Sequence, residues 1–187
     1  MSKLINNYLE KSMEGLKSLK KNDPKNILKS ANLIVKAFKN KKKMLICGNG
    51  GSASDSQHFA AELVGRFKKE RKPFPAISLN TDTSAITAIG NDYNYSKIFS
   101  RQIQGVGNSG DILFLISTSG KSENIINATK TAKEKRIKTI GLTGSKESIL
   151  SKNCDVCILV PSAETCHIQE LHIKVIHLLC ILIEKEF

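Results

Sequence analysis

The chain has 187 residues, of which 40% are hydrophobic and 25% are charged, as is typical of one globular domain with a substantial core. No apolar run approaches the roughly 20 residues of a membrane span, and the polar N-terminus lacks the apolar segment of a signal peptide. The five cysteines are odd in number and lie mostly in apolar segments, which favours reduced thiols over a disulfide framework. We therefore expect a cytoplasmic protein with a single domain.

The net charge of +12 is concentrated near the N-terminus. Residues 1–43 carry twelve lysines and three acidic residues, whereas the remaining chain carries 17 basic and 14 acidic residues. The lysine-rich part has no arginine and lacks the aromatic platforms on which single-stranded nucleic acids stack. We interpret the excess as a solvated face that adds a mild attraction for anionic substrates. We expect neither a nucleic-acid nor a membrane partner.

Two amphipathic helices are predicted ahead of the first strand. Apolar residues recur at helical spacing over residues 2–21 and again over residues 27–38. Asp23 is the expected N-cap of the second helix, and Pro24 is its expected first residue. The apolar faces of these helices must be buried against the sheet or against another subunit. We favour both, in an oligomer.

A strand, a glycine-rich turn and a helix follow within residues 43–66. The strand covers residues 44–47, the turn covers residues 48–51, and Phe59 and Leu63 share one face of the helix. Such a unit directs backbone N–H groups at the helix N-terminus, where an anion is favoured. Glycines allow the turn to adopt positive φ and to approach a ligand closely.

The first turns of this helix carry the polar side chains of a candidate site. Ser52, Ser54 and Asp55 are candidate caps and polar contacts. His58 and Glu62 are at positions i and i+4, so their side chains lie on one face. An anion-binding turn and a pair suited to proton transfer or metal binding are thus carried by one element.

The rest of the chain alternates strands and helices. Strands are predicted over residues 73–79, 111–116, 137–142 and 154–160, and helices over residues 83–89, 95–105, 123–135 and 165–186, with a short one after residue 144. Asp82 or Thr83 is expected to cap the first of these helices, and residues 90–92 to end it. The alternation predicts a three-layer α/β/α sandwich with a five-stranded parallel, flavodoxin-like sheet and ligands at the carboxyl ends of the strands. We divide the single domain into a helical arm over residues 1–40 and an α/β core over residues 41–187.

Two segments resemble nucleotide-binding motifs, but each lacks a residue that the motif requires. Residues 48–53 match a relaxed dinucleotide fingerprint, but the second strand ends at Asn80 without the acidic residue that binds the ribose. Residues 120–122 resemble the end of a P-loop, but Leu115 stands where that motif requires a glycine. We expect no nucleotide cofactor.

Four hydroxyl side chains crowd the junction between a buried strand and the next helix: Ser117, Thr118, Ser119 and Ser122. Helix capping would account for Ser119 or Ser122, but not for a run of three hydroxyls at the edge of the sheet. With the backbone N–H groups beside them, these hydroxyls favour a phosphate site that needs no metal or nucleotide.

The C-terminal helix mixes polar and apolar residues. Gln169 and His177 project within about 80° of each other but lie about 12 Å apart along the axis, so both side chains would have to lean inward to reach one atom. We interpret His172 as a structural or surface group.

Five ordered motifs combine these residues: Cys-Gly-Asn-Gly-Gly-Ser at 47–52, His-Phe-Ala-x-Glu-Leu at 58–63, Gly-Asn-Asp at 90–92, Ile-Ser-Thr-Ser-Gly at 116–120 and Ile-Gln-Glu-x-His-Ile-Lys-Val-Ile-His at 168–177. Together they resemble the SIS (sugar isomerase) family, specifically its phosphoheptose isomerase branch, over essentially the whole chain. The resemblance implies conversion of sedoheptulose 7-phosphate to D-glycero-D-manno-heptose 7-phosphate, the first step toward nucleotide-activated heptose for bacterial surface polysaccharide. It also implies a homotetramer with interfacial active sites, and often a bound zinc.

Matched position by position, the resemblance makes Glu62 the catalytic base and His177 the acid. The implied zinc ligands are His58, Glu62, Gln169 and His177. The implied sugar-phosphate contacts are Asn49, Gly50, Gly51, Glu62, Asn91, Asp92, Ser117, Thr118, Ser119, Ser122 and Gln169.

The residues suit this chemistry. A ketose–aldose shift moves a proton between adjacent carbons through an enediol, and it needs a base near C1–C2 and an acid near the oxygens. One Glu and two His also suit zinc, but a Gln ligand is weak, and Glu62 cannot easily be a free base and a tight ligand at once. We expect zinc and leave its role, catalytic or structural, open.

The chain departs from the family pattern before the last motif, where a shortened segment places Cys166 and His167 near the site. The role of this pair and the selectivity for sugar length stay open. Cys154 and Cys157 could join it in a zinc knuckle, but positions i and i+3 of a strand face opposite ways, which argues against that reading.

Two alternative functions remain. One is a non-catalytic sugar-phosphate sensor or protein-binding regulator of the SIS family, and the retention of both Glu62 and His177 favours the enzyme over it. The other is an isomerase of a pentulose or hexulose phosphate.

Overall fold

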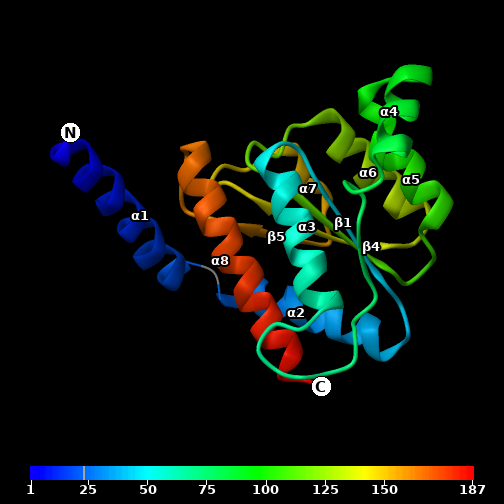
Figure 1. Cartoon of the computed structure of the whole chain (residues 1–187), viewed down its shortest axis with the longest axis horizontal. Coiled ribbons are helices and arrows are strands. Elements are labelled where there is room, and N and C mark those ends of the chain that lie inside the picture. The colour runs from blue at the N-terminus through cyan, green and yellow to red at the C-terminus, as the bar shows by residue number, and fades with distance from the viewer. Residues whose placement is uncertain (23) are drawn as a thin grey trace.

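The computed structural model of the chain describes residues 1–22 and 24–187, so the predicted cap Asp23 lies outside the described residues. Helices and strands alternate after an initial helical pair (Figure 1). The elements are α1 (Ser2–Asn22), α2 (Pro24–Lys39), β1 (Met44–Gly48), α3 (Gly51–Val64), β2 (Ala76–Ser78), α4 (Thr83–Asp92), the 3-10 helix η1 (Tyr95–Lys97), α5 (Ile98–Val106), β3 (Ile112–Ser117), α6 (Glu123–Glu134), β4 (Lys138–Thr143), α7 (Ile149–Asn153), β5 (Val156–Leu159) and α8 (Thr165–Glu184).

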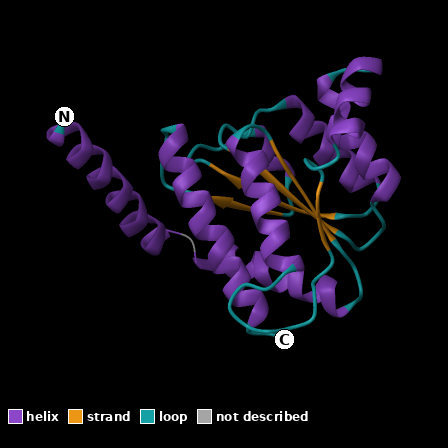
Figure 2. Ribbon diagram, in the orientation of Figure 1, coloured by secondary structure: helices purple, strands orange, loops and turns teal. Residues whose placement is uncertain are grey.

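The five strands form one parallel sheet in the order β2-β1-β3-β4-β5. The sheet lies at the centre of the body with helices on both faces (Figure 2). The chain winds outward in one direction from β1 to β2 and in the other from β3 to β5, so the strand order reverses between β1 and β3. In such sheets the carboxyl ends at the reversal point form the usual ligand crevice. The predicted flavodoxin-like architecture is confirmed.

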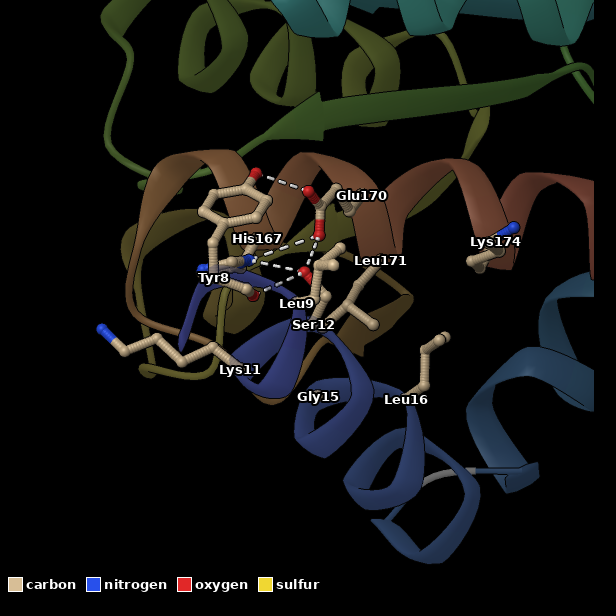
Figure 3. A pocket seen from close by; sticks show the side chains of 10 residues that line it. All are labelled: Tyr8, Leu9, Lys11, Ser12, Gly15, Leu16, His167, Glu170, Leu171 and Lys174. Atoms are coloured by element: carbon tan, nitrogen blue, oxygen red, sulfur yellow. Dashed lines mark hydrogen bonds and ion pairs between the residues drawn. The ribbon is translucent and has the colours of Figure 1, made fainter. Parts of the chain in front are cut away.

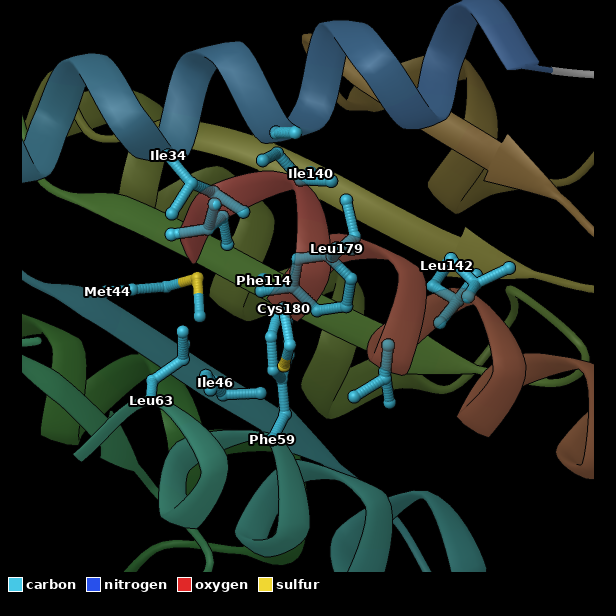
Figure 4. Packing of buried hydrophobic residues seen from close by; sticks show 14 of the residues in the cluster. Ile34, Met44, Ile46, Phe59, Leu63, Phe114, Ile140, Leu142, Leu179 and Cys180 are labelled. Carbon is cyan, nitrogen blue, oxygen red and sulfur yellow. The ribbon is translucent and has the colours of Figure 1, made fainter. Parts of the chain in front are cut away.

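Alternation along the strands builds a core on each face of the sheet. Ile46 and Phe114 point toward α2, α3 and α8, whereas Leu45 and Leu113 point toward α5 and α6. On the α3 side, the ring of Phe59 packs edge-on against Phe114 with centroids 5.1 Å apart, and Leu63 and Cys180 also enter the core (Figure 4). This packing fixes α3 and α8 side by side on the sheet.

The arm α1 packs differently from the other long helices. It contacts α8 from Tyr8 to Leu19, and in Figure 1 its N-terminal end projects away from the body. Among its described side chains only Leu19, near the C-terminal end, is buried, and its apolar stripe is exposed. The exposed members are Leu4, Ile5, Tyr8, Leu9, Met13 and Leu16.

The predicted N-cap of α3 needs correction, whereas that of α4 is confirmed. The N-cap of α3 is Gly50, with φ of 58° and no side-chain cap bond, so Ser52, Ser54 and Asp55 lie inside the helix and do not cap it. The predicted cap of α4 is confirmed, because Oδ1 of Asp82 accepts the N–H of Ala85 at 2.8 Å.

The same helix α4 does not stop at Ile89 but continues to Asp92. The predicted stop signal at residues 90–92 therefore forms its last turn. Glycine is tolerated inside a helix at a cost of about 1 kcal/mol, which is why a single Gly90 is a weak stop signal.

Cys154 and Cys157 do not lie on one strand as predicted. Cys154 is the C-cap of α7 and precedes β5, so strand alternation does not apply to it. Both sulfurs flank Gly141, where an added Cβ would lie 2.9 Å from Sγ of Cys157 and 3.1 Å from Sγ of Cys154. Among the described residues no third His, Cys, Asp or Glu joins the two in a metal-ligating group, and no disulfide is formed there.

Helix α8 is long and apolar enough by composition to cross a membrane, and half of its apolar window is buried. It packs against α1, α2 and α3. It is a core helix of the sandwich, and its composition follows from that position.

Candidate active site

Three candidate ligands or catalysts converge between α3 and α8. One ligand atom each from His58, Glu62 and His177 lies within 4.8 Å of the other two. Nε2 of His58 is 3.0 Å from Oε1 of Glu62, and the rings of His58 and His177 meet edge-on with centroids 5.3 Å apart. The predicted i, i+4 pair on α3 is therefore completed by a residue that is more than a hundred positions away in the sequence.

The packing of α3 explains why the cluster faces outward from the core. Phe59 and Leu63 are fully buried, and each neighbours a cluster residue in the sequence. His58 keeps 45% of its side chain exposed and Glu62 keeps 24%. A carboxylate and an imidazole are thus held on a rigid helix while remaining accessible to a ligand.

His177 lies in a partly apolar environment. Its ring is 5.3 Å from the ring of Phe67 and lines an apolar groove of about 430 Å³ together with Leu178 and Ile181. Burial, aided by the charge of His58, lowers the pKa of His177 below its ordinary value, while Glu62 opposes the shift. A lower pKa favours the neutral imidazole at neutral pH, the form in which a histidine binds a metal ion.

The cluster has the chemistry of a metal site. Two imidazoles and one carboxylate are the donor set that zinc takes in many enzymes, with a fourth position left for water or substrate. The close approach of the three ligand atoms fits one divalent ion.

Gln169, the fourth predicted ligand, belongs to α8, and its side chain lies against the start of α3. A Cβ added to Gly51 would collide with the amide of Gln169, so this side chain covers the N-terminal turn of the helix. His58 is seven residues further along α3, about 10 Å along its axis. The structure therefore places Gln169 beside the glycine turn, where its amide covers Gly51.

The glycine turn is braced by side chains that the sequence did not single out. The amides of Asn49 and Asn124 exchange two hydrogen bonds of 2.9 Å, and the hydroxyl of Tyr95 donates to Oδ1 of Asn49 at 3.0 Å. These contacts connect the end of β1 to α6 and η1 across the reversal point of the sheet. No local sequence signal links Asn124 or Tyr95 to Asn49, because the residues are 75 and 46 positions away.

The predicted hydroxyl run lies at the carboxyl end of β3. The hydroxyl of Ser117 accepts the N–H of Gly120, and that of Ser119 accepts the N–H of Lys121. Ser122 is the N-cap of α6 but makes no side-chain cap bond, so capping does not use its hydroxyl. Thr118, Ser119 and Lys121 line a cavity of about 240 Å³ at this edge of the sheet.

Asn91 and Asp92 are not brought to the cluster by this chain. They form the exposed end of α4, where the amide of Asn91 donates to the carboxylate of Asp92 at 3.0 Å. In Figure 1, α4 lies at the opposite side of the body from α8.

Asp55 is a polar residue of α3 whose burial sequence reasoning missed. Its Oδ2 is buried and has no hydrogen-bond partner among the described residues. Burial raises the pKa of Asp55 to about 6, although the nearby His58 opposes the shift. The residue lies one turn before His58 and could have been found from its i, i+3 spacing to that residue.

Cys166 and His167 lie where the arm meets α8. The buried ring of His167 packs against Tyr8, and its Nδ1 lies 3.2 Å from the hydroxyl of Ser12 and 3.3 Å from Oε2 of Glu170. Tyr8 and Ser12 both donate to Glu170 beside a cavity of about 270 Å³ (Figure 3). This polar cluster attaches α1 to α8.

Comparison with known proteins identifies the family. The profile of the SIS domain matches residues 7–144. The phosphoheptose isomerase of Helicobacter pylori (strain ATCC 700392 / 26695) is 50% identical over 179 residues, covering 96% of this chain and 90% of the relative. That of a Nitratiruptor species is 54% identical over 155 residues, covering 83% of each.

The resemblance extends to three dimensions. The structure of a phosphoheptose isomerase from Francisella tularensis superposes with a TM-score of 0.95 at 39% identity, covering 98% of this chain and 97% of that one. Fold, length and sequence agree over nearly the whole molecule, so this chain belongs to the phosphoheptose isomerases of the SIS-domain family.

Proposed function

We propose that this chain isomerises sedoheptulose 7-phosphate to D-glycero-D-manno-heptose 7-phosphate. The observation that carries the proposal is the meeting of Glu62 and His177, one carboxylate and one imidazole from two packed helices, in a chain that is half identical to phosphoheptose isomerases. A ketose–aldose shift needs one such acid–base pair. The product would enter the supply of activated heptose for a surface polysaccharide.

Glu62 is the base of this proposal. Its carboxylate removes a proton from C1 of the ketose while His177 donates a proton to the carbonyl oxygen at C2, which yields the enediol. Glu62 then returns its proton to C2, and the hydroxyl at C1 gives its proton to His177 as the aldehyde forms. Both groups end in their starting protonation states, so the cycle is balanced.

The phosphate is held at the carboxyl ends of β1 and β3. Ser117, Thr118, Ser119 and Ser122 offer hydroxyls and backbone N–H groups, and Asn49, Gly50 and Gly51 border the same crevice. The N-termini of α3 and α6 add positive potential there. Gln169, over Gly51, contacts the sugar in this arrangement.

Zinc is the proposed metal. His58, Glu62 and His177 would hold it, with Gln169 as the fourth predicted ligand. When bound, the ion would polarise the oxygens of the sugar as a Lewis acid. The proton transfers described above are assigned to Glu62 and His177 alone.

The proposed assembly is a homotetramer with interfacial active sites in the cytoplasm. The apolar stripe of α1 is exposed, and the apolar groove beside His177 is lined by Leu16 and Leu19 of the same arm. A contiguous apolar surface of this kind is typical of a protein interface. A second copy would also supply a route by which Asn91 and Asp92 reach a site.

The proposal is tested by an isomerase assay with sedoheptulose 7-phosphate on the wild type, Glu62→Gln and His177→Ala. Each variant should lose about 10²- to 10⁴-fold in turnover, the range that general acid–base catalysis contributes, while still binding a phosphate ligand. Pentulose and hexulose phosphates serve as substrate controls. Tight binding without turnover by the wild type would instead support the sugar-phosphate sensor.

A further inference from the structure

The carboxylate of Glu184 is buried at the end of α8, where its side chain is 3% exposed. It accepts backbone N–H groups from three consecutive residues, Phe67 at 2.9 Å, Lys68 at 2.9 Å and Lys69 at 3.2 Å. Successive N–H groups of this kind form a concave site for an anion. Burial alone would raise the pKa of Glu184, but these donors and Arg71 hold it below its ordinary value.

The guanidinium of Arg71, 8% exposed, connects this carboxylate to the end of α3. Its Nε donates to Oε1 of Glu184 at 3.0 Å. Nη2 donates to the backbone carbonyl of Glu62 at 2.8 Å, and Nη1 to that of Leu63 at 2.9 Å. These carbonyls belong to the last turn of α3, which has no further helical N–H groups to pair with.

The ion pair of Arg71 and Glu184 is connected to both members of the acid–base pair. Arg71 holds the backbone of Glu62 itself. Glu184 holds the backbone N–H of Phe67, whose ring packs 5.3 Å from that of His177. A residue from the end of α8 and a residue from the loop after α3 thus join the two helices at the turn that carries the site.

We propose that Arg71 and Glu184 are positioning residues of the isomerase, which fix the spacing between Glu62 and His177. The inference rests on the proposed function, because it assigns the pair a role in that reaction. Proton transfer needs heavy atoms at about 2.6–3.2 Å from the atoms they serve. A misplacement of about 1 Å from a change outside the reacting groups can cost about 10²-fold in rate.

The test compares two changes in the pair with a matched buried ion pair elsewhere. Glu184→Gln removes the charge and keeps the shape, and Arg71→Lys keeps the charge and removes the planar fork. Asp111→Asn is the control. Asp111 is equally buried and accepts from the backbone and ammonium of Lys43 and from Asn108, on segments that lead into β1 and β3.

We expect all three variants to lose thermal stability, but only Glu184→Gln and Arg71→Lys to lose kcat. The expected fall is about 10- to 100-fold, with KM within about 3-fold of the wild type, because the phosphate contacts lie at the other end of α3. Amide hydrogen exchange at residues 67–69 should accelerate in Glu184→Gln and stay unchanged in Asp111→Asn. An unchanged kcat in both variants of the pair, or an equal fall in Asp111→Asn, would overturn the proposal.

Failure of the proposed function gives a different set of results from failure of the positioning role. If the wild type does not turn over sedoheptulose 7-phosphate, the isomerase proposal fails and the positioning role fails with it, whereas hydrogen exchange still shows whether Glu184 holds the loop. If the wild type is active, the kcat of the variants decides the positioning role alone.

Discussion

Helix α3 and the arm α1 carry apolar stripes of similar spacing, yet the stripe of α3 is buried and that of α1 is exposed. Phe59 on α3 is fully buried, while Leu9 on α1 is 53% exposed. The buried stripe sets the acid–base pair on a rigid support between sheet and α8. The open stripe leaves the arm attached through a small polar cluster. The difference fits the proposed assembly, in which one chain builds the reacting groups and a second copy would cover the open stripe.

The largest effect should come from the arm. Leu9→Asp places a charge in the exposed stripe of α1 and should dissociate the assembly into smaller species, with loss of turnover if active sites are interfacial. Burying an unpaired carboxylate costs several kcal/mol per site. Analytical ultracentrifugation and the isomerase assay measure both outcomes.

Asn7→Asp is the control for that change, since it adds the same charge to an exposed position of α1 outside the apolar stripe. It should leave both the sedimentation coefficient and the activity unchanged. A Leu9→Asp protein that sediments like the wild type would contradict the role given to the arm.

The buried stripe should respond to truncation with a loss of stability. Phe59→Ala removes a ring that packs against Phe114, and the free energy of unfolding should fall by about 3–5 kcal/mol at any protein concentration. Leu9→Ala should cost stability only as a function of concentration if, as in the proposed assembly, its side chain is buried between copies. Urea unfolding at two protein concentrations separates the cases, and equal concentration dependence would refute the distinction.

A smaller effect concerns pH. Burial lowers the pKa of His172 to about 4, against about 6.5 in an unfolded chain. Between these values the unfolded state binds a proton that the folded state excludes. The free energy of unfolding is therefore unaffected by His172 above pH 6.5. As the pH falls from 6.5 toward 4, exclusion of this proton lowers the free energy of unfolding by about 3 kcal/mol at most.

His172→Leu isolates this contribution. Urea midpoints between pH 4 and 7 should depend less on pH in the variant than in the wild type. Asp55, whose pKa is raised to about 6, acts in the opposite direction in both proteins and cancels in the comparison. Identical slopes would show that His172 does not exclude its proton when folded.

Periodic and local patterns predicted much of this molecule. The alternation of strands and helices led to the parallel sheet, and the i, i+4 spacing placed His58 beside Glu62 at 3.0 Å. The cap of α3 was missed because Gly50 adopts positive φ and bonds through its backbone. The geometry at Cys154 was missed because β5 starts two residues later than its apolar run.

Contacts between distant segments could not be predicted from those patterns. Arg71 and Glu184 are 113 residues apart, and each looks like an ordinary surface charge in its own segment. The side chain that covers Gly51 comes from a glutamine of α8. Such contacts depend on the packing of finished helices, which spacing within one helix does not encode.

The most direct test of the central claim is isomerisation of sedoheptulose 7-phosphate in D₂O, followed by NMR of the product. If Glu62 carries the proton between C1 and C2 through an enediol, that proton is open to exchange with solvent while it is on the carboxyl group, so deuterium should accumulate at C2 of the heptose 7-phosphate over repeated turnovers. Glu62→Gln should lose both turnover and this label. A complete absence of deuterium at C2 after many turnovers at equilibrium, or labelling that persists undiminished in Glu62→Gln, would contradict the account.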